Sequence, residues 1–169
     1  GVDIIINNAA TNPVFGSIQQ TEERAFDKII DVNLKGPFEL SKKAYPILKE
    51  RGGGSIINVS SIGGLTPEAG IGIYSASKAA IINLTKAMAQ DWGADHIRVN
   101  AVCPGLIKTK FSEALWNNEA ILERFLQHIP IKRVGIPEDI AGLAVYLASD
   151  AAAYCTGGIY MVDGGYTAT

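Results

Sequence analysis

Residues 54–92 read GSIINVSSIGGLTPEAGIGIYSASKAAIINLTKAMAQDW, an apolar run followed by a glycine-rich loop and a long segment with helical spacing. The run at 54–60 is continuous in apolar character rather than alternating, which is typical of a parallel strand covered on both faces. The segment at 74–92 is apolar on almost every side, so it must be covered by the sheet and by a further surface. This strand, loop and helix predict an α/β fold.

Three further apolar runs indicate buried strands, at 2–8, 97–103 and 159–162. Segments with helical spacing lie between and around them, at 21–49, 113–128 and 137–149. Gly36-Pro37 should kink or divide the first helix, and Pro-Glu-Asp at 137–139 suits the start of the last one. The alternation of strands and helices predicts one domain over residues 1–169, built on a doubly wound parallel sheet with right-handed crossovers.

Composition excludes several classes of function. The chain has 169 residues, 47% of them hydrophobic and 19% charged, and a formal net charge of −2 with scattered basic residues, so nucleic acid is not an expected partner. Cys103 and Cys155 lie far apart without a metal-ligand spacing, so we expect neither a disulfide scaffold nor a metal site. No apolar run is long enough to span a bilayer. We therefore expect a cytoplasmic enzyme.

The candidate reactive side chains lie in the stretch Tyr-Ser-Ala-Ser-Lys at positions 74–78. Residues four apart share a helix face, so the Lys78 ammonium should stand one turn from the Tyr74 phenol and lower its pKa toward neutrality. Ser61, thirteen residues before Tyr74, ends the preceding strand, where its hydroxyl could donate to a developing oxyanion. A tyrosine and lysine at this spacing are usually only a surface pair. The serine at the carboxyl end of a strand, where ligands bind in open α/β sheets, favours a reaction centre instead.

These residues resemble the short-chain dehydrogenase/reductase family, and the resemblance extends through essentially the whole chain. Asn-Asn-Ala-Ala at 7–10 is similar to the family's N-N-A-G segment, with Ala10 where glycine is usual. The resemblance implies that Asn8 and Ala9 contact the adenosine side of a nicotinamide cofactor. Asp-Val-Asn-Leu at 31–34 resembles a helical segment in which Asn33 holds a proton-relay water. The alternative for Asn33 is a polar residue that caps the kink.

Two other motifs agree with the family. Ser60-Ser61 resembles its serine pair, in which the spacing to Tyr74 selects Ser61 as catalytic and leaves Ser60 structural. Pro-Gly-Leu-Ile-Lys-Thr at 104–109 resembles the loop that covers the nicotinamide, and Val-Asp-Gly-Gly at 162–165 resembles the closing strand and turn. With Tyr74 and Lys78, the implied cofactor contacts on this side are Pro104, Gly105, Ile107 and Thr109.

The resemblance implies an oxidoreductase that transfers a hydride between NAD(P)(H) and a carbonyl or alcohol. In the reductive direction Tyr74 would protonate the carbonyl oxygen and Ser61 would fix it, while Lys78 would bond the nicotinamide ribose. The segment after Pro104 should be a mobile lid over the substrate. Its candidate substrate contacts are Leu106, Phe111, Leu115 and Trp116, with Ile121 and Phe125 also available; for each of them the alternative is packing onto the core. His96 and His128 match no motif and are assigned to surface or structural roles.

Three strings within the chain resemble the dehydrogenase/reductase member 4 group, carbonyl reductases often described as NADPH-dependent retinol dehydrogenases. They are AATNPVFGS at 9–17, RGGGS at 51–55, and GLIKTKFS at 105–112 with Leu115-Trp116. This resemblance slightly favours NADP(H). We also expect a homo-oligomer, a dimer or a homotetramer, assembled through the helices at 21–49 and 74–92.

The family's glycine-rich G-x-x-x-G-x-G turn occurs nowhere in the 169 residues, and neither does the residue that selects NAD or NADP. The resemblance implies a seven-stranded sheet, of which the first three strands are lacking here. The strand at 4–6 would then be an uncovered apolar edge, which natural proteins avoid. Our hypothesis is an incomplete record or a truncated product of a longer chain.

Two alternatives stay open. A non-catalytic remnant could associate with full-length subunits through the same two helices. A sugar-nucleotide epimerase or dehydratase could use a similar Tyr/Lys pair, although no large substrate domain follows Tyr74.

Overall fold

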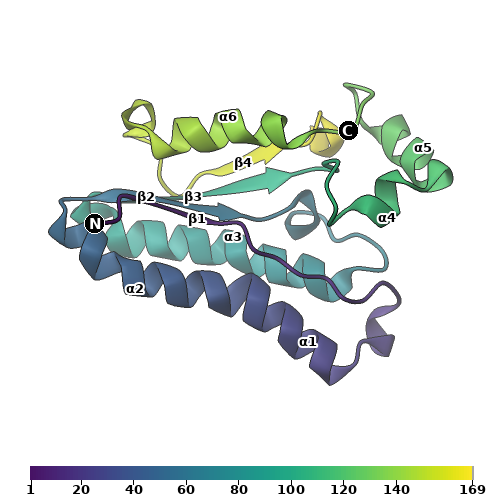
Figure 1. Cartoon of the computed structure of the whole chain (residues 1–169), viewed down its shortest axis with the longest axis horizontal. Helices are drawn as coiled ribbons and strands as arrows, with labels where there is room; N and C mark the ends of the chain where they lie inside the picture. The colour runs from purple at the N-terminus through teal and green to yellow at the C-terminus, as the bar shows by residue number, and fades with distance from the viewer. Residues whose placement is uncertain (169) are drawn as a thin grey trace.

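The computed structural model describes residues 1–168 and contains one sheet of four parallel strands in the order β1-β2-β3-β4 (Figure 1). The strands are β1 (Ile4–Asn7), β2 (Gly54–Val59), β3 (Ile97–Pro104) and β4 (Ile159–Val162). The parallel sheet and all four strands are confirmed. The first strand is shorter than predicted, the second ends one residue earlier, and the third ends one residue later.

Helices cover both faces of this sheet. They are α1 (Glu23–Ile30), a π-helical segment (Asp31–Lys35), α2 (Gly36–Glu50), α3 (Gly72–Trp92), α4 (Glu113–Trp116), α5 (Glu119–His128) and α6 (Pro137–Ala148). Short 3₁₀ turns lie at Ile18–Gln20, Ile62–Gly64, Gly93–Asp95, Asp150–Ala152 and Tyr166–Ala168. In Figure 1 the helices α1, α2 and α3 lie on one face and α6 on the other, while α4 and α5 lie beyond the carboxyl ends of the strands.

Two predicted helices are divided in the structure. The predicted helix at 21–49 has its irregularity just before Gly36-Pro37, where the Gly36 N–H bonds to the carbonyl of Asp31, five residues back. Pro37 has no N–H to continue the normal ladder, which favours such a local rearrangement. The predicted helix at 113–128 is interrupted because the Asn118 side chain accepts a hydrogen bond from the Ile121 N–H at 3.1 Å and so caps the start of α5.

The core has two layers, one on each face of the sheet. Ile56 packs with Leu48, Met88, Ile97 and Val99 beneath α2 and α3. Its neighbour in β2, Ile57, packs on the other face with Val102, Leu147 and Ala152 beneath α6. Successive side chains of a strand point to opposite faces, so one continuously apolar strand serves both layers. The two-sided burial predicted for the run at 54–60 is confirmed.

Two surfaces carry exposed side chains of low polarity. β1 is an edge strand in which Ile4 and Ile6 are 46% and 50% exposed, so the predicted apolar edge is present. On α3, Ala76, Ala79 and Ala87 are exposed. The predicted coverage of this helix on two sides is therefore not supplied by residues 1–168 alone. Within the same residues no helix is both long and apolar enough to cross a membrane.

Candidate active site

Ser61, Tyr74 and Lys78 lie together where β2 ends and α3 begins. Ser61 lies two residues after the end of β2 and caps the turn at Ile62–Gly64, its Oγ accepting a hydrogen bond from the Gly63 N–H at 3.1 Å. The Tyr74 phenol lies next to the Ser61 side chain, which lowers its pKa. The Lys78 Nζ lies 5.7 Å from the centroid of the Tyr74 ring. The structure thus brings the three predicted residues into one cluster at the carboxyl end of the sheet.

Lys78 is the largest side chain that is almost fully buried, with 2% of its surface exposed. Its Nζ donates a hydrogen bond to the Val59 carbonyl at 2.7 Å, and its own carbonyl accepts one from the Ser60 Oγ at 2.8 Å. Ser60 therefore fastens β2 to α3, in the structural role predicted for it. Because burial disfavours the ammonium form, the pKa of Lys78 falls to about 8.

Burial also dominates the titration of Tyr74. It raises the pKa of the phenol to about 12, and the neighbouring Ser61 side chain lowers it by less; the negative charge of Glu68 raises it further. This direction is opposite to the predicted lowering by Lys78. The prediction was wrong because burial of the phenol outweighs any stabilisation of the phenolate by the Lys78 ammonium, which is held by the Val59 carbonyl. Near neutral pH Tyr74 is protonated and can act as a proton donor.

Asn33 is 1% exposed and lies in the π-helical segment. Its Nδ2 donates to the Thr11 carbonyl and to the Ser77 Oγ, both at 3.0 Å, and its Oδ1 accepts from the Thr11 N–H at 2.8 Å. The side chain thus joins the loop after β1 to α3, one turn from Tyr74. Both amide hydrogens are occupied, so a relay water at Asn33, which stays a prediction, would have to donate to the Oδ1 or contact the main chain.

A buried polar network was missed by the sequence interpretation. The Asn7 Nδ2 donates to the Ser41 Oγ at 3.0 Å and to the Asn58 Oδ1 at 2.7 Å, and the Asn58 Nδ2 donates to the Thr85 Oγ1 at 2.9 Å. These four residues are buried and join β1, α2, β2 and α3. The available signal was an asparagine inside an apolar strand, because a buried amide requires partners.

The predicted cofactor residues lie on two loops that flank the cluster. Asn8 and Ala9 are exposed directly after β1, and residues 104–109 begin with the last residue of β3. A Cβ on Gly105 would lie 2.9 Å from the Asp163 Cα, so glycine is required there for the close approach of the two chain segments. Both loops open at the carboxyl ends of strands next to Ser61, and this arrangement fits a dinucleotide.

One side of the 104–109 loop is fastened to α4. The Thr109 Oγ1 lies 3.2 Å from the Ser112 Oγ, and the Trp116 Nε1 donates to the Thr109 carbonyl at 2.9 Å. The Lys108 Nζ lies 4.9 Å from the centroid of the Trp116 ring. The Trp116 indole N–H therefore holds the 104–109 loop.

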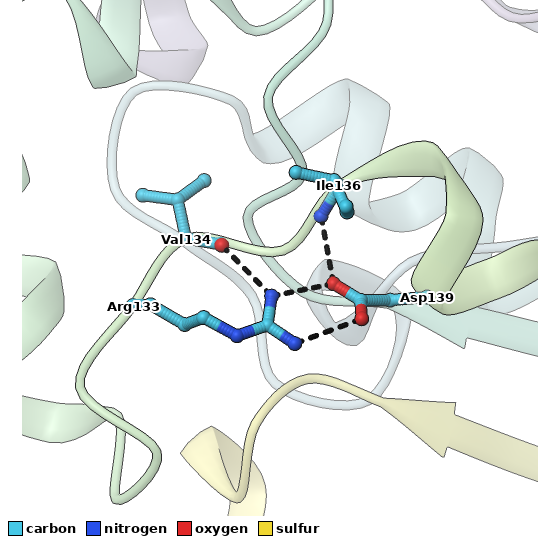
Figure 2. A network of polar contacts seen from close by, with 4 residues as sticks. All are labelled: Arg133, Val134, Ile136 and Asp139. Atoms are coloured by element: carbon cyan, nitrogen blue, oxygen red, sulfur yellow. Dashed lines mark hydrogen bonds and ion pairs between the residues drawn. The ribbon is translucent and has the colours of Figure 1, made fainter.

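The other side of the loop is paired with a polar corner before α6. The Lys108 N–H donates to the Gly135 carbonyl at 2.8 Å, and the Gly135 N–H donates to the Leu106 carbonyl at 3.0 Å. Figure 2 shows how this corner is fixed: Arg133 donates to both carboxylate oxygens of Asp139, at 2.6 and 2.8 Å. The bond from Arg133 is the largest influence on the pKa of Asp139, which falls to about 2. The loop is thus held on both sides.

The four predicted substrate contacts lie in different environments. Leu106 is 7% exposed and belongs to the core, which was its alternative. Phe111 is 57% exposed, and its ring centroid lies 6.0 Å from that of Tyr74, while Leu115 is half-buried. Of the four candidates, Phe111 is the one with a ring contact to the Ser61, Tyr74 and Lys78 cluster. His96 and His128 are both exposed.

Comparison with known proteins covers nearly all of the chain. Residues 1–167 match a family model described as enoyl-(acyl carrier protein) reductase. The chain is 44% identical over 165 residues to dehydrogenase/reductase SDR family member 4 from Oryctolagus cuniculus, which covers 98% of this chain and 64% of that protein. The chain thus spans less than two thirds of the length of this curated relative.

Solved structures agree with the fold. A gluconate 5-dehydrogenase from Burkholderia cenocepacia, in complex with NADP and tartrate, has a TM-score of 0.97 at 31% identity, covering 100% of this chain and 66% of that one. A 4-hydroxyisoleucine dehydrogenase complexed with NADH has a TM-score of 0.94 at 38% identity, covering 99% and 69% of the two chains. The four-stranded sheet and its helices are therefore similar to about two thirds of such structures.

Proposed function

Since this chain belongs to the short-chain dehydrogenase/reductase family, we propose that it carries the reaction centre of an enzyme that interconverts a carbonyl and an alcohol with a nicotinamide cofactor. The observation that supports this most is the cluster of Ser61, Tyr74 and Lys78 at the carboxyl end of β2. A nicotinamide would supply or accept the hydride when bound. The residues proposed to hold the cofactor are Asn8, Ala9, Tyr74, Lys78, Pro104, Gly105, Ile107 and Thr109.

The chain's own residues handle the proton. The Ser61 hydroxyl and the Tyr74 phenol are neighbours, so both can donate to one carbonyl oxygen placed beside them. Tyr74 is protonated near neutral pH and gives up its proton as the alcohol forms. The resulting phenolate is buried beside the Lys78 ammonium, which compensates its charge. Lys78 is itself anchored by Val59, so this charge is already in place before the reaction.

The surface near Tyr74 on which we propose that the substrate binds is partly aromatic. The Phe111 ring lies near Tyr74, and the ring centroids of Phe125 and Tyr166 lie 5.7 Å apart. We infer that an aromatic or otherwise planar carbonyl compound suits this surface, because aromatic rings pair favourably at such separations.

Cofactor choice and assembly are parts of the same proposal. The strings shared with the member 4 group favour NADP(H), and the similar gluconate 5-dehydrogenase structure contains NADP. The similar 4-hydroxyisoleucine dehydrogenase contains NADH, so both cofactors belong in the test. We propose a homo-oligomer in which a second copy covers the exposed face of α3.

The test is a panel of aromatic aldehydes and diketones supplied with NADPH and, separately, with NADH. Oxidation of the reduced nicotinamide in proportion to alcohol formed is the expected result, with the larger kcat/KM for NADPH. If the protein does not change the fluorescence of the nicotinamide and does not reduce any of the carbonyl compounds, the result would support the non-catalytic remnant instead. Lys78→Ala serves as an internal check and should weaken cofactor binding as well as turnover.

A further inference from the structure

Glu68 lies in the loop between Ser61 and Tyr74, on a backbone that is held in place. The Gly70 carbonyl accepts a hydrogen bond from the Gly16 N–H at 2.9 Å. Gly70 has a φ of +84°, and a Cβ there would lie 2.9 Å from the Phe15 Cζ. These contacts fix the loop against the segment that follows β1.

The same loop is also tied to the first turn of α3. The Glu68 carbonyl accepts a hydrogen bond from the Ile71 N–H at 3.4 Å, and the Glu68 N–H points toward the Ser75 Oγ at 3.5 Å. Ser75 is the residue next to Tyr74. The position of Glu68 relative to the reacting phenol is thus set by the fold.

The carboxylate of Glu68 has no hydrogen bond and no ion pair with any group of residues 1–168, although it is half-buried. Other acidic groups near this end of the sheet are paired: Asp139 with Arg133, and Asp163 with Thr167 and the Gly165 N–H. Partial burial of an unpaired carboxylate is unfavourable, and its pKa is raised for that reason. Such a group beside a reaction centre indicates a binding role.

The electrostatic influence of Glu68 extends to two tyrosines. Its negative charge raises the pKa of Tyr74 and of Tyr166. The Tyr166 ring centroid lies 5.7 Å from that of Phe125 and 6.3 Å from that of His128. Together with the 3.5 Å between the Glu68 nitrogen and the Ser75 Oγ, next to Tyr74, these influences indicate that Glu68 faces the proton donor and the aromatic surface formed by α5 and the turn at Tyr166–Ala168.

We propose that Glu68 determines substrate specificity, selecting carbonyl compounds that carry a cationic or hydrogen-bond-donating group and disfavouring those that carry a carboxylate. This rests on the proposed function. A substrate cation would provide the partner that the carboxylate lacks, and the faces of Tyr166 and Phe125 are also favourable to cations. A carboxylate on the substrate would be repelled by the carboxylate of Glu68, because no cation among residues 1–168 is bonded to Glu68.

The experiment compares 4-trimethylammoniobenzaldehyde with its isosteric neutral match, 4-tert-butylbenzaldehyde, and with 4-formylbenzoate, on the full natural polypeptide at about pH 8, where the carboxylate is ionised. The variant is Glu68→Gln, which keeps the shape and removes the charge. Glu50→Gln, an exposed glutamate at the end of α2, is the matched control. Intrinsic differences in aldehyde reactivity cancel when ratios of kcat/KM are compared between wild type and variant.

We expect Glu68→Gln to lower the cation-to-neutral ratio about tenfold and to raise the carboxylate-to-neutral ratio in the same proportion. Glu50→Gln should leave both ratios unchanged. Ratios that do not change in Glu68→Gln, with the neutral aldehyde still reduced, would overturn the proposal. Glu68→Lys provides a second measurement and should invert the preference toward 4-formylbenzoate.

Binding separates this proposal from the proposed function. Dissociation constants of the three corresponding benzyl alcohols can be measured by ligand-observed NMR. A protein that binds the cationic alcohol in a Glu68-dependent manner but reduces no aldehyde would refute the proposed function and support the role of Glu68. Equal binding of all three alcohols by wild type and Glu68→Gln would refute the role of Glu68, whether or not the aldehydes are reduced.

Discussion

Replacing Lys78 by methionine should make the protein more stable while removing its activity. The Lys78 side chain is 2% exposed, and burial lowers its pKa from the ordinary 10.5 to about 8. That difference corresponds to roughly 3 kcal/mol of destabilisation below about pH 8, where the ammonium is charged in both the folded and the unfolded chain. Methionine fills a similar volume without a charge but loses the hydrogen bond to the Val59 carbonyl, which is worth about 1 kcal/mol. We expect a net gain of roughly 1–3 kcal/mol near pH 7.

The free energy of unfolding should also depend on pH in a direction that can be checked. Between about pH 8 and 10.5 the unfolded chain holds a proton on Lys78 that the folded chain has released. The free energy of unfolding of wild type should therefore rise with pH across this range, and the penalty should be fully present below about pH 8. Tyr74, whose pKa is raised to about 12, acts in the opposite direction above about pH 10, so measurements should stop there.

Urea unfolding followed by circular dichroism, at intervals between about pH 7 and 9.5, measures both effects. Lys78→Met should be more stable than wild type near neutral pH, and the gap should narrow as pH rises. Lys86→Met, an exposed lysine on the same helix, is the control and should follow wild type. If Lys78→Met is less stable than wild type at every pH and the wild-type curve is flat, the ammonium is not penalised by burial and our account of the site is wrong.

Three further changes test other parts of the structure. Asn58→Leu removes one hydrogen bond from each of its buried partners, Asn7 and Thr85, and should lower the free energy of unfolding by about 2 kcal/mol in urea titrations; a loss below about 0.5 kcal/mol would mean that these two bonds carry little stability. Ser112→Ala removes the contact to the Thr109 hydroxyl, while Trp116 still holds the Thr109 carbonyl, and should weaken cofactor binding about tenfold with kcat little changed; equal affinities in fluorescence titrations would refute the role of this contact. Glu68→Gln should lower the pKa of Tyr74 in a spectrophotometric titration, whereas an unchanged midpoint would show that the two groups do not interact.

Much of the fold could be predicted from the sequence because its elements are locally specified. The apolar runs of β2 and β3 are buried on both faces, and the glycines at the element boundaries mark the turns. The division of the predicted helix at 21–49 was recognised from Gly36-Pro37, but its π-helical form depends on how the Gly36 N–H finds a carbonyl five residues back. That choice is made by the fold and not by local propensity.

The site was predictable as a set of residues and less so as a set of interactions. Lys78 lies beside Tyr74 because residues four apart share one face of a helix. Ser61 lies near them because it follows the carboxyl end of the preceding parallel strand. The direction of the Tyr74 pKa was not predictable, because burial and the anchoring of Lys78 on Val59 are tertiary effects. The hydrogen bond of Trp116 to Thr109 was not predictable for the same reason, since it depends on how α4 lies against the 104–109 loop; a contact of its ring with the substrate stays a prediction.

Tyr74→Phe tests the central claim most directly. The variant removes one hydroxyl and keeps the ring that packs near Phe111, so the fold and the cofactor loops should be unaffected. We predict that reduction of an aromatic aldehyde, measured as oxidation of NADPH or NADH, falls by about 10²–10⁴-fold while nicotinamide fluorescence reports unchanged cofactor binding. Turnover within a few-fold of wild type would contradict the assignment of Tyr74 as the proton donor, and with it the reaction centre proposed for this chain.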